Sequence, residues 1–177
     1  MTCIVGLVHD GKVHIGGDSA ASEGALLVVR KDPKVFTVGS YLIGCTSSFR
    51  MLQLLAHAFT PPEWDRRRDL YAFLVTDFID AVRDCFRAGG FMRRDSEVEA
   101  GGVFLVGVAG RLFEIEEDYQ VGETLNGFAA IGCGREVALG SLYSTDGKAP
   151  EARVLLALQA AEAFGTAVRG PFNMQVI

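Results

Sequence analysis

Residues 2–19 of the chain read TCIVGLVHDGKVHIGGDS. Asp10-Gly11 is a strong signal for a two-residue turn, and it lies between two apolar segments rich in residues that favour strands. We therefore expect residues 2–9 to pair with residues 12–19 as an antiparallel hairpin. This pairing brings Asp18 beside the start of the chain.

The side-chain alternation along this hairpin leaves one point open. A regular ladder puts Asp18 opposite Cys3 and on the same face as Cys3, not on the face of Thr2. Either Thr2 leaves the ladder, or a glycine in Gly16-Gly17 bends it. Both arrangements leave a carboxylate near the chain start.

Thr2 directly follows the initiator methionine. If Met1 is removed, Thr2 carries a hydroxyl nucleophile and an amine base on one residue. The amine has an ordinary pKa of about 7.7 to 8.0, so part of it is neutral at pH 7. An ammonium such as Lys34 would favour the neutral amine and the developing alkoxide, and Asp18 would keep that lysine charged and oriented. Taken singly, each residue also has an ordinary interpretation. Thr2 could simply follow the initiator methionine, Asp18 could end a turn, and Lys34 could be a solvated surface residue.

These residues resemble a known family, the N-terminal-nucleophile hydrolases of the proteasome β type and especially the bacterial HslV-type peptidase. In that family a processed threonine begins a strand that ends in Gly-Asp, and a Lys-Val pair follows. Thr2, Gly17-Asp18 and Lys34-Val35 match that pattern without a gap once Met1 is removed. Further along, Gly132-Cys133-Gly134 corresponds to the family's Gly-Ser-Gly. The resemblance covers most of the chain and implies an α+β fold, a four-layer α/β/β/α sandwich of two mainly antiparallel sheets.

The resemblance also implies catalytic roles. Thr2 would attack a peptide carbonyl, Lys34 would tune the nucleophile, and Asp18 would hold Lys34. Cys133 stands where the family has a supporting serine, and a thiol is a weaker hydrogen-bond partner than a hydroxyl. Cys133 is equally compatible with a buried structural cysteine. The aspartate that the family carries in its late helix is not evident near Glu162.

Substrate-binding roles follow from the same resemblance. Ser22 would bind the substrate backbone, and Cys45 would line the pocket for the residue that precedes the cut. Backbone N–H groups near Ser47, where a strand turns into a helix, would stabilise the oxyanion.

Composition restricts the remaining possibilities. A chain of 177 residues that is 49% apolar and 22% charged suits one domain, residues 1–177, with a sizeable core. The formal net charge of -5 argues against nucleic-acid binding. The four cysteines and three histidines show no zinc-ligand spacing, so we expect no metal and read the cysteines as reduced thiols in a cytoplasm.

Two further absences in the sequence shape the expectations. No Gly-Lys-Ser/Thr follows residues 132–134, so we expect no nucleotide and no other cofactor. No apolar run reaches the length of about 18 residues that a membrane helix needs, and no signal sequence is evident. Since one methionine precedes Thr2, we expect methionine aminopeptidase to expose it, without a propeptide.

Periodicity and turn signals predict the order strands, two helices, strands, two helices. This order favours helices on the outer faces of two stacked sheets. The tail, residues 169–177, could be an edge strand or a flexible end. Besides the first hairpin, we expect strands at 26–29, 35–38, 41–46, 102–108, 111–115 and 128–133, and helices from Ser47 or Ser48 to Ala58, from Leu70 to Gly89-Gly90, at 135–143 and at 150–164.

The function implied by the resemblance is a self-compartmentalising threonine endopeptidase that acts on proteins and peptides. Its expected form is a homo-oligomeric ring, with a separate ATP-dependent unfoldase as a possible partner. Two other hypotheses stay open: an N-terminal-nucleophile amidase that acts on small amides, and a catalytically silent ring subunit.

Overall fold

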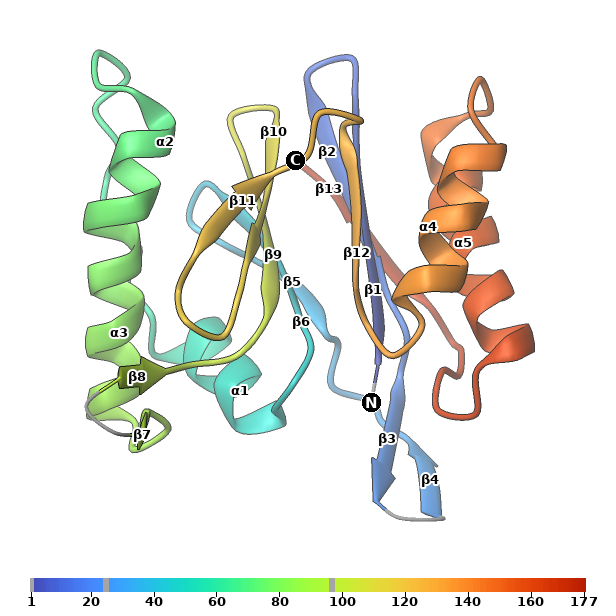
Figure 1. Cartoon of the computed structure of the whole chain (residues 1–177), viewed down its shortest axis with the longest axis horizontal. Helices are drawn as coiled ribbons and strands as arrows, with labels where there is room; N and C mark the ends of the chain where they lie inside the picture. Colours follow the sequence, from blue (N-terminus) through green and yellow to red (C-terminus); the bar gives the residue numbers. More distant parts are fainter. Residues whose placement is uncertain (1, 24–25, 96–97) are drawn as a thin grey trace.

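The chain folds into four layers, helix, sheet, sheet and helix (Figure 1). The computed structural model describes residues 2–23, 26–95 and 98–177. One sheet has the strand order β12-β1-β2-β13, and the other has the order β11-β10-β9-β6-β5. All strand pairs in both sheets are antiparallel. The predicted α/β/β/α sandwich is therefore confirmed.

The strands and helices follow the predicted order. In chain order, the strands are β1 (Cys3–His9), β2 (Lys12–Gly17), β3 (Ala20–Glu23), β4 (Leu26–Val29), β5 (Val35–Val38), β6 (Tyr41–Cys45), β7 (Arg93–Asp95), β8 (Val98–Ala100), β9 (Phe104–Val108), β10 (Arg111–Ile115), β11 (Val121–Glu123), β12 (Phe128–Gly132) and β13 (Asn173–Val176). The helices are α1 (Phe49–His57), α2 (Leu70–Phe73), the π-helical turn η1 (Leu74–Phe78), α3 (Ile79–Ala88), α4 (Arg135–Ser144) and α5 (Pro150–Phe164).

The first hairpin has the predicted register, with His9 opposite Lys12 and Ile4 opposite Gly17. Thr2 and Asp18 both lie just outside the strands, although the Asp18 N–H still donates to the Cys3 carbonyl at 3.2 Å. The open point is thus resolved, because Thr2 has left the regular ladder. The alternation of side chains along a strand therefore does not decide the face on which Thr2 or Asp18 lies.

Two other regions differ from or complete the predictions. The single helix expected from Leu70 is interrupted by η1, where one extra residue per turn shifts which positions face the core. Leu74 and Phe78, the first and last residues of η1, are both buried. The tail forms β13, an edge strand that pairs with β2, so the strand alternative was the right one.

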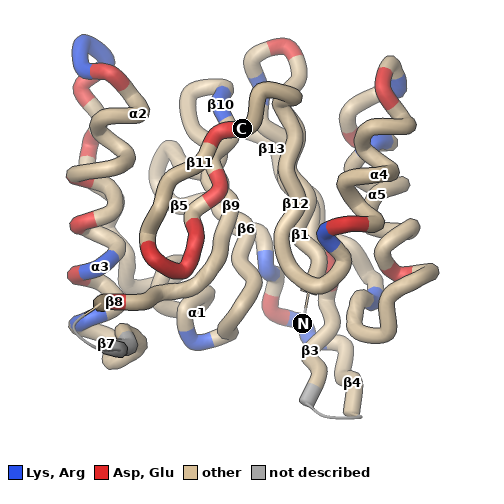
Figure 2. Tube along the Cα trace, in the orientation of Figure 1, with Lys and Arg blue, Asp and Glu red and all other residues tan. Residues whose placement is uncertain are grey.

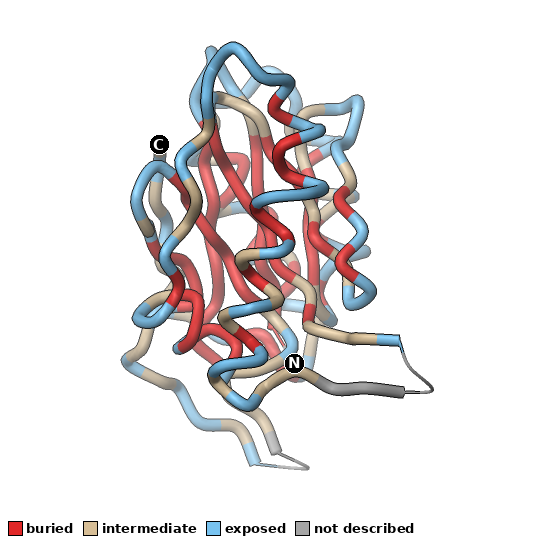
Figure 3. Tube along the Cα trace, turned by 90° about the vertical axis from the view of Figure 1, so that its left-hand side faces the viewer, coloured by how far each residue is buried: buried red, intermediate tan, exposed pale blue. Residues whose placement is uncertain are grey.

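Three apolar layers hold the sheets and helices together. Side chains of β1 alternate, so that Ile4 packs between the two sheets while Val5 and Leu7 pack under α4 and α5. A third cluster joins the five-stranded sheet to α1, α2 and α3. Figure 3 shows the buried residues running along the sheets and the inward faces of the helices. In Figure 2, the Lys, Arg, Asp and Glu positions along the chain trace fall mainly on helices and connections.

Antiparallel pairing gathers several strand ends at one end of the sandwich. The start of β1 lies beside the ends of β2 and β12, since Ile4 pairs with Gly17 and Cys3 with Gly132. The start of β5 lies beside the end of β6. A methyl group on Gly17 would lie 3.0 Å from Val35 Cγ2, so the two sheets touch closely at this end. Chain segments far apart in the sequence therefore meet there.

Within the described part of the chain, none of the helices has the length and apolar character that crossing a bilayer requires.

Close packing between the sheets gives a stability prediction. A methyl group at Gly44 would lie 2.6 Å from Ile4 Cγ2 and 2.9 Å from Ile15 Cγ2, so Gly44→Ala must displace buried side chains. We expect the free energy of unfolding to fall by about 1–3 kcal/mol in urea titrations. Gly140→Ala is the control, because nothing lies within 4 Å of the added methyl and the helix gains about 0.5–1 kcal/mol. Equal unfolding midpoints for the two variants would contradict this packing.

Candidate active site

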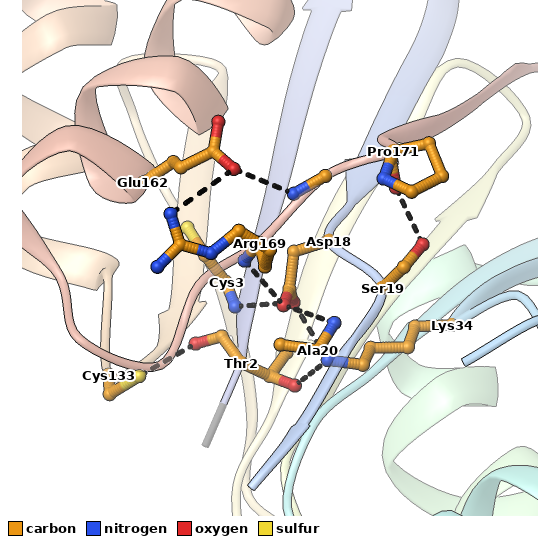
Figure 4. Close-up of polar contacts among 11 residues, drawn as sticks. Thr2, Cys3, Asp18, Ser19, Ala20, Lys34, Cys133, Glu162, Arg169 and Pro171 are labelled. Atoms are coloured by element: carbon orange, nitrogen blue, oxygen red, sulfur yellow. Dashed lines mark hydrogen bonds and ion pairs between the residues drawn. The ribbon is translucent and has the colours of Figure 1, made fainter. Parts of the chain in front are cut away.

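Thr2, Asp18 and Lys34 lie together at the end of the sandwich where the strand ends meet (Figure 4). All three are buried, with exposed fractions of 4%, 1% and 3%. Lys34 Nζ donates a short hydrogen bond to Thr2 Oγ and another to Asp18 Oδ1 at 2.8 Å. The structure therefore brings three of the four predicted catalytic residues into one hydrogen-bonded chain.

The Asp18 carboxylate is the hub of this site. Its Oδ1 also accepts from the Cys3 N–H at 3.0 Å, and its Oδ2 accepts from the N–H groups of Ala20 at 2.9 Å and Arg169 at 3.4 Å. Together with Lys34, four donors from different segments converge on this carboxylate. A buried charge needs such partners, since an unpaired one costs several kcal/mol.

The Lys34 ammonium experiences two opposing effects. Burial lowers the pKa of Lys34 from its ordinary 10.5, because it disfavours the charged form, and the charge and hydrogen bond of Asp18 act against that shift. Burial likewise raises the pKa of the nearby Cys3 thiol to about 12, and the charge of Asp18 adds to that rise. Cys3 itself is fully buried and packs in the core between its sheet and α4 and α5.

The loop after β12 holds the Thr2 backbone from the other side. The Thr2 carbonyl accepts from Gly134 N–H and from Cys133 Sγ, each at 3.4 Å. Gly132 has a φ of 90°, and a Cβ there would lie 2.2 Å from the Thr2 carbonyl oxygen. Only glycine allows this approach. Cys133 is exposed, so the alternative of a buried structural cysteine is wrong.

A pocket of about 900 Å³ opens beside Thr2. Ser22, Cys45 and Ser47, the three residues with expected substrate-binding roles, all line it. Ser22 contributes a buried hydroxyl that has no hydrogen-bond partner among the described residues. Cys45 is fully enclosed, and burial raises its pKa.

The turn between β6 and α1 has a strained backbone. Ser47 has a φ of 63°, a region that residues other than glycine seldom adopt. Its Oγ accepts from Val103 N–H at 3.1 Å, and the Ser48 N–H donates to Thr46 O at 2.7 Å. Strained backbone of this kind is concentrated at functional sites. Ser48 then caps α1, with its side chain accepting from Arg50 N–H.

Sequence reasoning missed the segment that follows α5. Glu162 Oε1 accepts from Gly170 N–H at 2.9 Å and lies 3.9 Å from Arg169 Nη1. This contact fixes the segment whose Arg169 N–H reaches Asp18 (Figure 4). Glu162 therefore helps to position the Arg169 backbone N–H that donates to Asp18. A backbone donor has no side-chain signature, so no sequence motif could have identified it.

The described residues contain no cluster of three or more His, Cys, Asp or Glu side chains that could hold a metal ion. The four cysteines, Cys3, Cys45, Cys85 and Cys133, are not in disulfide bonds in this structure.

The buried ion pair gives a prediction about stability. Asp18→Asn leaves the Lys34 ammonium buried without a counter-charge, so the free energy of unfolding should fall by about 3–5 kcal/mol. Urea unfolding measures this loss, and adding Lys34→Met should restore part of it. Asp65→Asn is the matched control, because it breaks an exposed Arg67–Asp65 pair and should have little effect. A loss no larger than that of the control would show that Lys34 does not depend on Asp18.

Solved structures similar to this chain share its fold over nearly its whole length. BPH of Thiobacillus denitrificans, in complex with epoxomicin, has a TM-score of 0.83 at 20% identity, covering 99% of this chain and 98% of that one. Eukaryotic HslV from Trypanosoma brucei has a TM-score of 0.68 at 16% identity, covering 99% and 98%. Anbu, an ancestral beta-subunit from Yersinia bercovieri, has a TM-score of 0.68 at 13% identity, covering 99% and 81%.

No protein-family model matches the chain, and no curated protein sequence matches it. The structural likeness confirms, at the level of the fold, the resemblance seen in the sequence. This chain has the fold of the N-terminal-nucleophile hydrolases of the proteasome β and HslV type.

Proposed function

We propose that this protein is a threonine endopeptidase that hydrolyses peptide bonds through Thr2. One observation carries the proposal: the Lys34 ammonium donates to the Thr2 hydroxyl while Asp18 holds that ammonium in a buried site. A lysine donor at this oxygen stabilises the alkoxide that forms during attack. The proposal requires removal of Met1, which lies outside the described residues.

In the proposed reaction, the free amine of Thr2 acts as the general base. It takes the hydroxyl proton as Thr2 Oγ bonds to the carbonyl carbon of the substrate. The tetrahedral intermediate collapses to an ester on Thr2, and the leaving amine takes the proton from the Thr2 amine. A water molecule, activated by the same amine, then attacks the ester and releases the acid product and the free hydroxyl.

Other residues bind the substrate. Backbone N–H groups of the strained turn at Ser47 stabilise the oxyanion. Ser22 on β3 binds the substrate backbone, and Cys45 lines the pocket for the residue that precedes the cut. The pocket of about 900 Å³ supports a peptide substrate, since it is near the upper end of the usual range of about 300–1,000 Å³.

The proposal extends to the assembly. Residues 1–177 form one peptidase domain, and its copies form a homo-oligomeric ring in the cytoplasm that encloses the sites. The HslV and beta-subunit folds of the similar structures support such a ring. A separate ATP-dependent unfoldase would deliver folded proteins to it.

Replacing the nucleophile tests the proposed function. Thr2→Ala should lower hydrolysis of unfolded casein and of fluorogenic peptide amides by about 1,000-fold or more, because no other residue supplies the attacking oxygen. Thr145→Ala, the same change on the α4 side of the molecule, should leave the rate unchanged. Size-exclusion chromatography checks that both variants assemble like the parent protein.

The other hypotheses give different results in that experiment. Turnover of small amides without cleavage of peptides would indicate the amidase. No turnover at all, with Met1 retained, would indicate the silent ring subunit. Full peptide hydrolysis by Thr2→Ala would overturn the assignment of the nucleophile.

Cys133 gives a second functional prediction. Its thiol lies 3.4 Å from the Thr2 carbonyl, and a serine hydroxyl would make a stronger hydrogen bond there. Cys133→Ser should therefore keep or raise kcat/KM, whereas Cys133→Ala should lower it by about 2- to 10-fold. Steady-state peptide hydrolysis measures both. If the alanine variant matched the parent, the thiol would have no part in holding Thr2.

A further inference from the structure

The pocket beside Thr2 is lined by apolar side chains, by hydroxyl groups and by two positively charged side chains. Leu26 and Val28 of the β3–β4 hairpin line it, and this hairpin projects past the sheets next to the chain start (Figure 1). Leu52 and Phe49 of α1 line the same pocket. Arg30, which directly follows β4, also lines this pocket.

Arg30 is held in a defined orientation. Its Cζ lies 3.9 Å from the centroid of the Phe49 ring, which is a close cation–π contact. Its Nε and Nη2 donate to the two carboxylate oxygens of Asp32 at 2.9 and 2.8 Å. The Arg30 backbone N–H donates to Ser19 O at 2.8 Å. The Phe49 ring, the Asp32 carboxylate and the backbone bond to Ser19 together fix the orientation of the Arg30 guanidinium.

The pair with Asp32 does not use all the donors of Arg30. A guanidinium has five N–H groups, and Asp32 accepts from two of them, so three are not used in this pair. The Arg30 side chain is 37% exposed, so a bound group can reach these donors. Asp32 itself does not line the pocket.

Among the residues that the structure describes, the charged groups lining the pocket have one sign. Arg30 and Lys34 are both part of the wall, and the Lys34 Nζ lies 5.8 Å from the centroid of the same Phe49 ring. No Asp or Glu is found among the described residues that line the pocket. A side chain that enters therefore meets N–H donors, hydroxyls and apolar surface.

From this geometry we propose that the pocket selects an acidic side chain, such as glutamate, in the residue that precedes the cut, and that Arg30 determines this specificity. A carboxylate gains charge-assisted hydrogen bonds from the free N–H groups of Arg30 while its methylene groups pack on Phe49. A lysine or arginine side chain is disfavoured, because Arg30 and Lys34 line the pocket whereas their partners Asp32 and Asp18 do not. This inference rests on the proposed function, since it names the substrate class of the same site.

The test compares fluorogenic tetrapeptide amides that differ only in having Glu, Gln, Leu or Arg before the cut. The parent protein should show the highest kcat/KM with Glu and the lowest with Arg. Arg30→Met should lower kcat/KM for Glu by about 10- to 100-fold and leave that for Leu within about 2-fold, as expected for loss of hydrogen bonds to a charged group. Arg67→Met is the matched control, because Arg67 makes the same two-oxygen contact with a nearby carboxylate, that of Asp65, but does not line the pocket.

Preference of the parent for Leu or Arg, or equal loss of all substrates in Arg30→Met, would overturn the inference. A binding experiment separates it from the proposed function. The Thr2→Ala protein is titrated by calorimetry with acetylated tetrapeptides that end in Glu or Leu carboxamide. Tighter binding of the Glu peptide, lost in Thr2→Ala/Arg30→Met, would support the selectivity even if the parent protein proved to have no peptidase activity. Equal binding of the two peptides would contradict it.

Discussion

The buried Asp18 carboxylate is the constraint on which the rest of this structure depends. It is fully enclosed and joins the start of β1, the start of β3, the residue before β5 and the segment after α5. Burying an ion pair often adds no net stability compared with apolar packing. The pair of Asp18 and Lys34 is better explained by what it positions, since Lys34 also donates to Thr2 Oγ.

The four-layer architecture makes this site possible because both sheets contribute to it. Thr2 and Asp18 flank strands of one sheet, whereas Lys34 precedes a strand of the other. Glycine allows the sheets and loops to approach closely, as at Gly132, where any side chain would collide with the Thr2 carbonyl. The strained backbone at Ser47 borders the same pocket. The framework is thus closely packed where Thr2, Asp18 and Lys34 lie.

Much of this arrangement could be predicted from the sequence. Asp10-Gly11 set the first hairpin and its register, and helical periodicity located α1, α4 and α5. The resemblance named Thr2, Asp18 and Lys34, which the structure brings together.

Other features could not be predicted because they depend on tertiary contacts. The short strands β3 and β11 have no clear alternating pattern, and η1 is a local change within an otherwise regular helical pattern. The Arg169 N–H that reaches Asp18 is a backbone group in a tail that was compatible with two structures. The orientation of Arg30 results from contacts with Phe49 and Asp32 in the folded chain.

The most direct measurement is intact mass spectrometry with peptide mapping, before and after incubation with a peptide epoxyketone that targets N-terminal threonines. If Thr2 is a working N-terminal nucleophile, the protein will have lost Met1 and will carry one adduct on Thr2. A protein that retains Met1 and stays unmodified at Thr2 would contradict the claim that this site is a working N-terminal nucleophile.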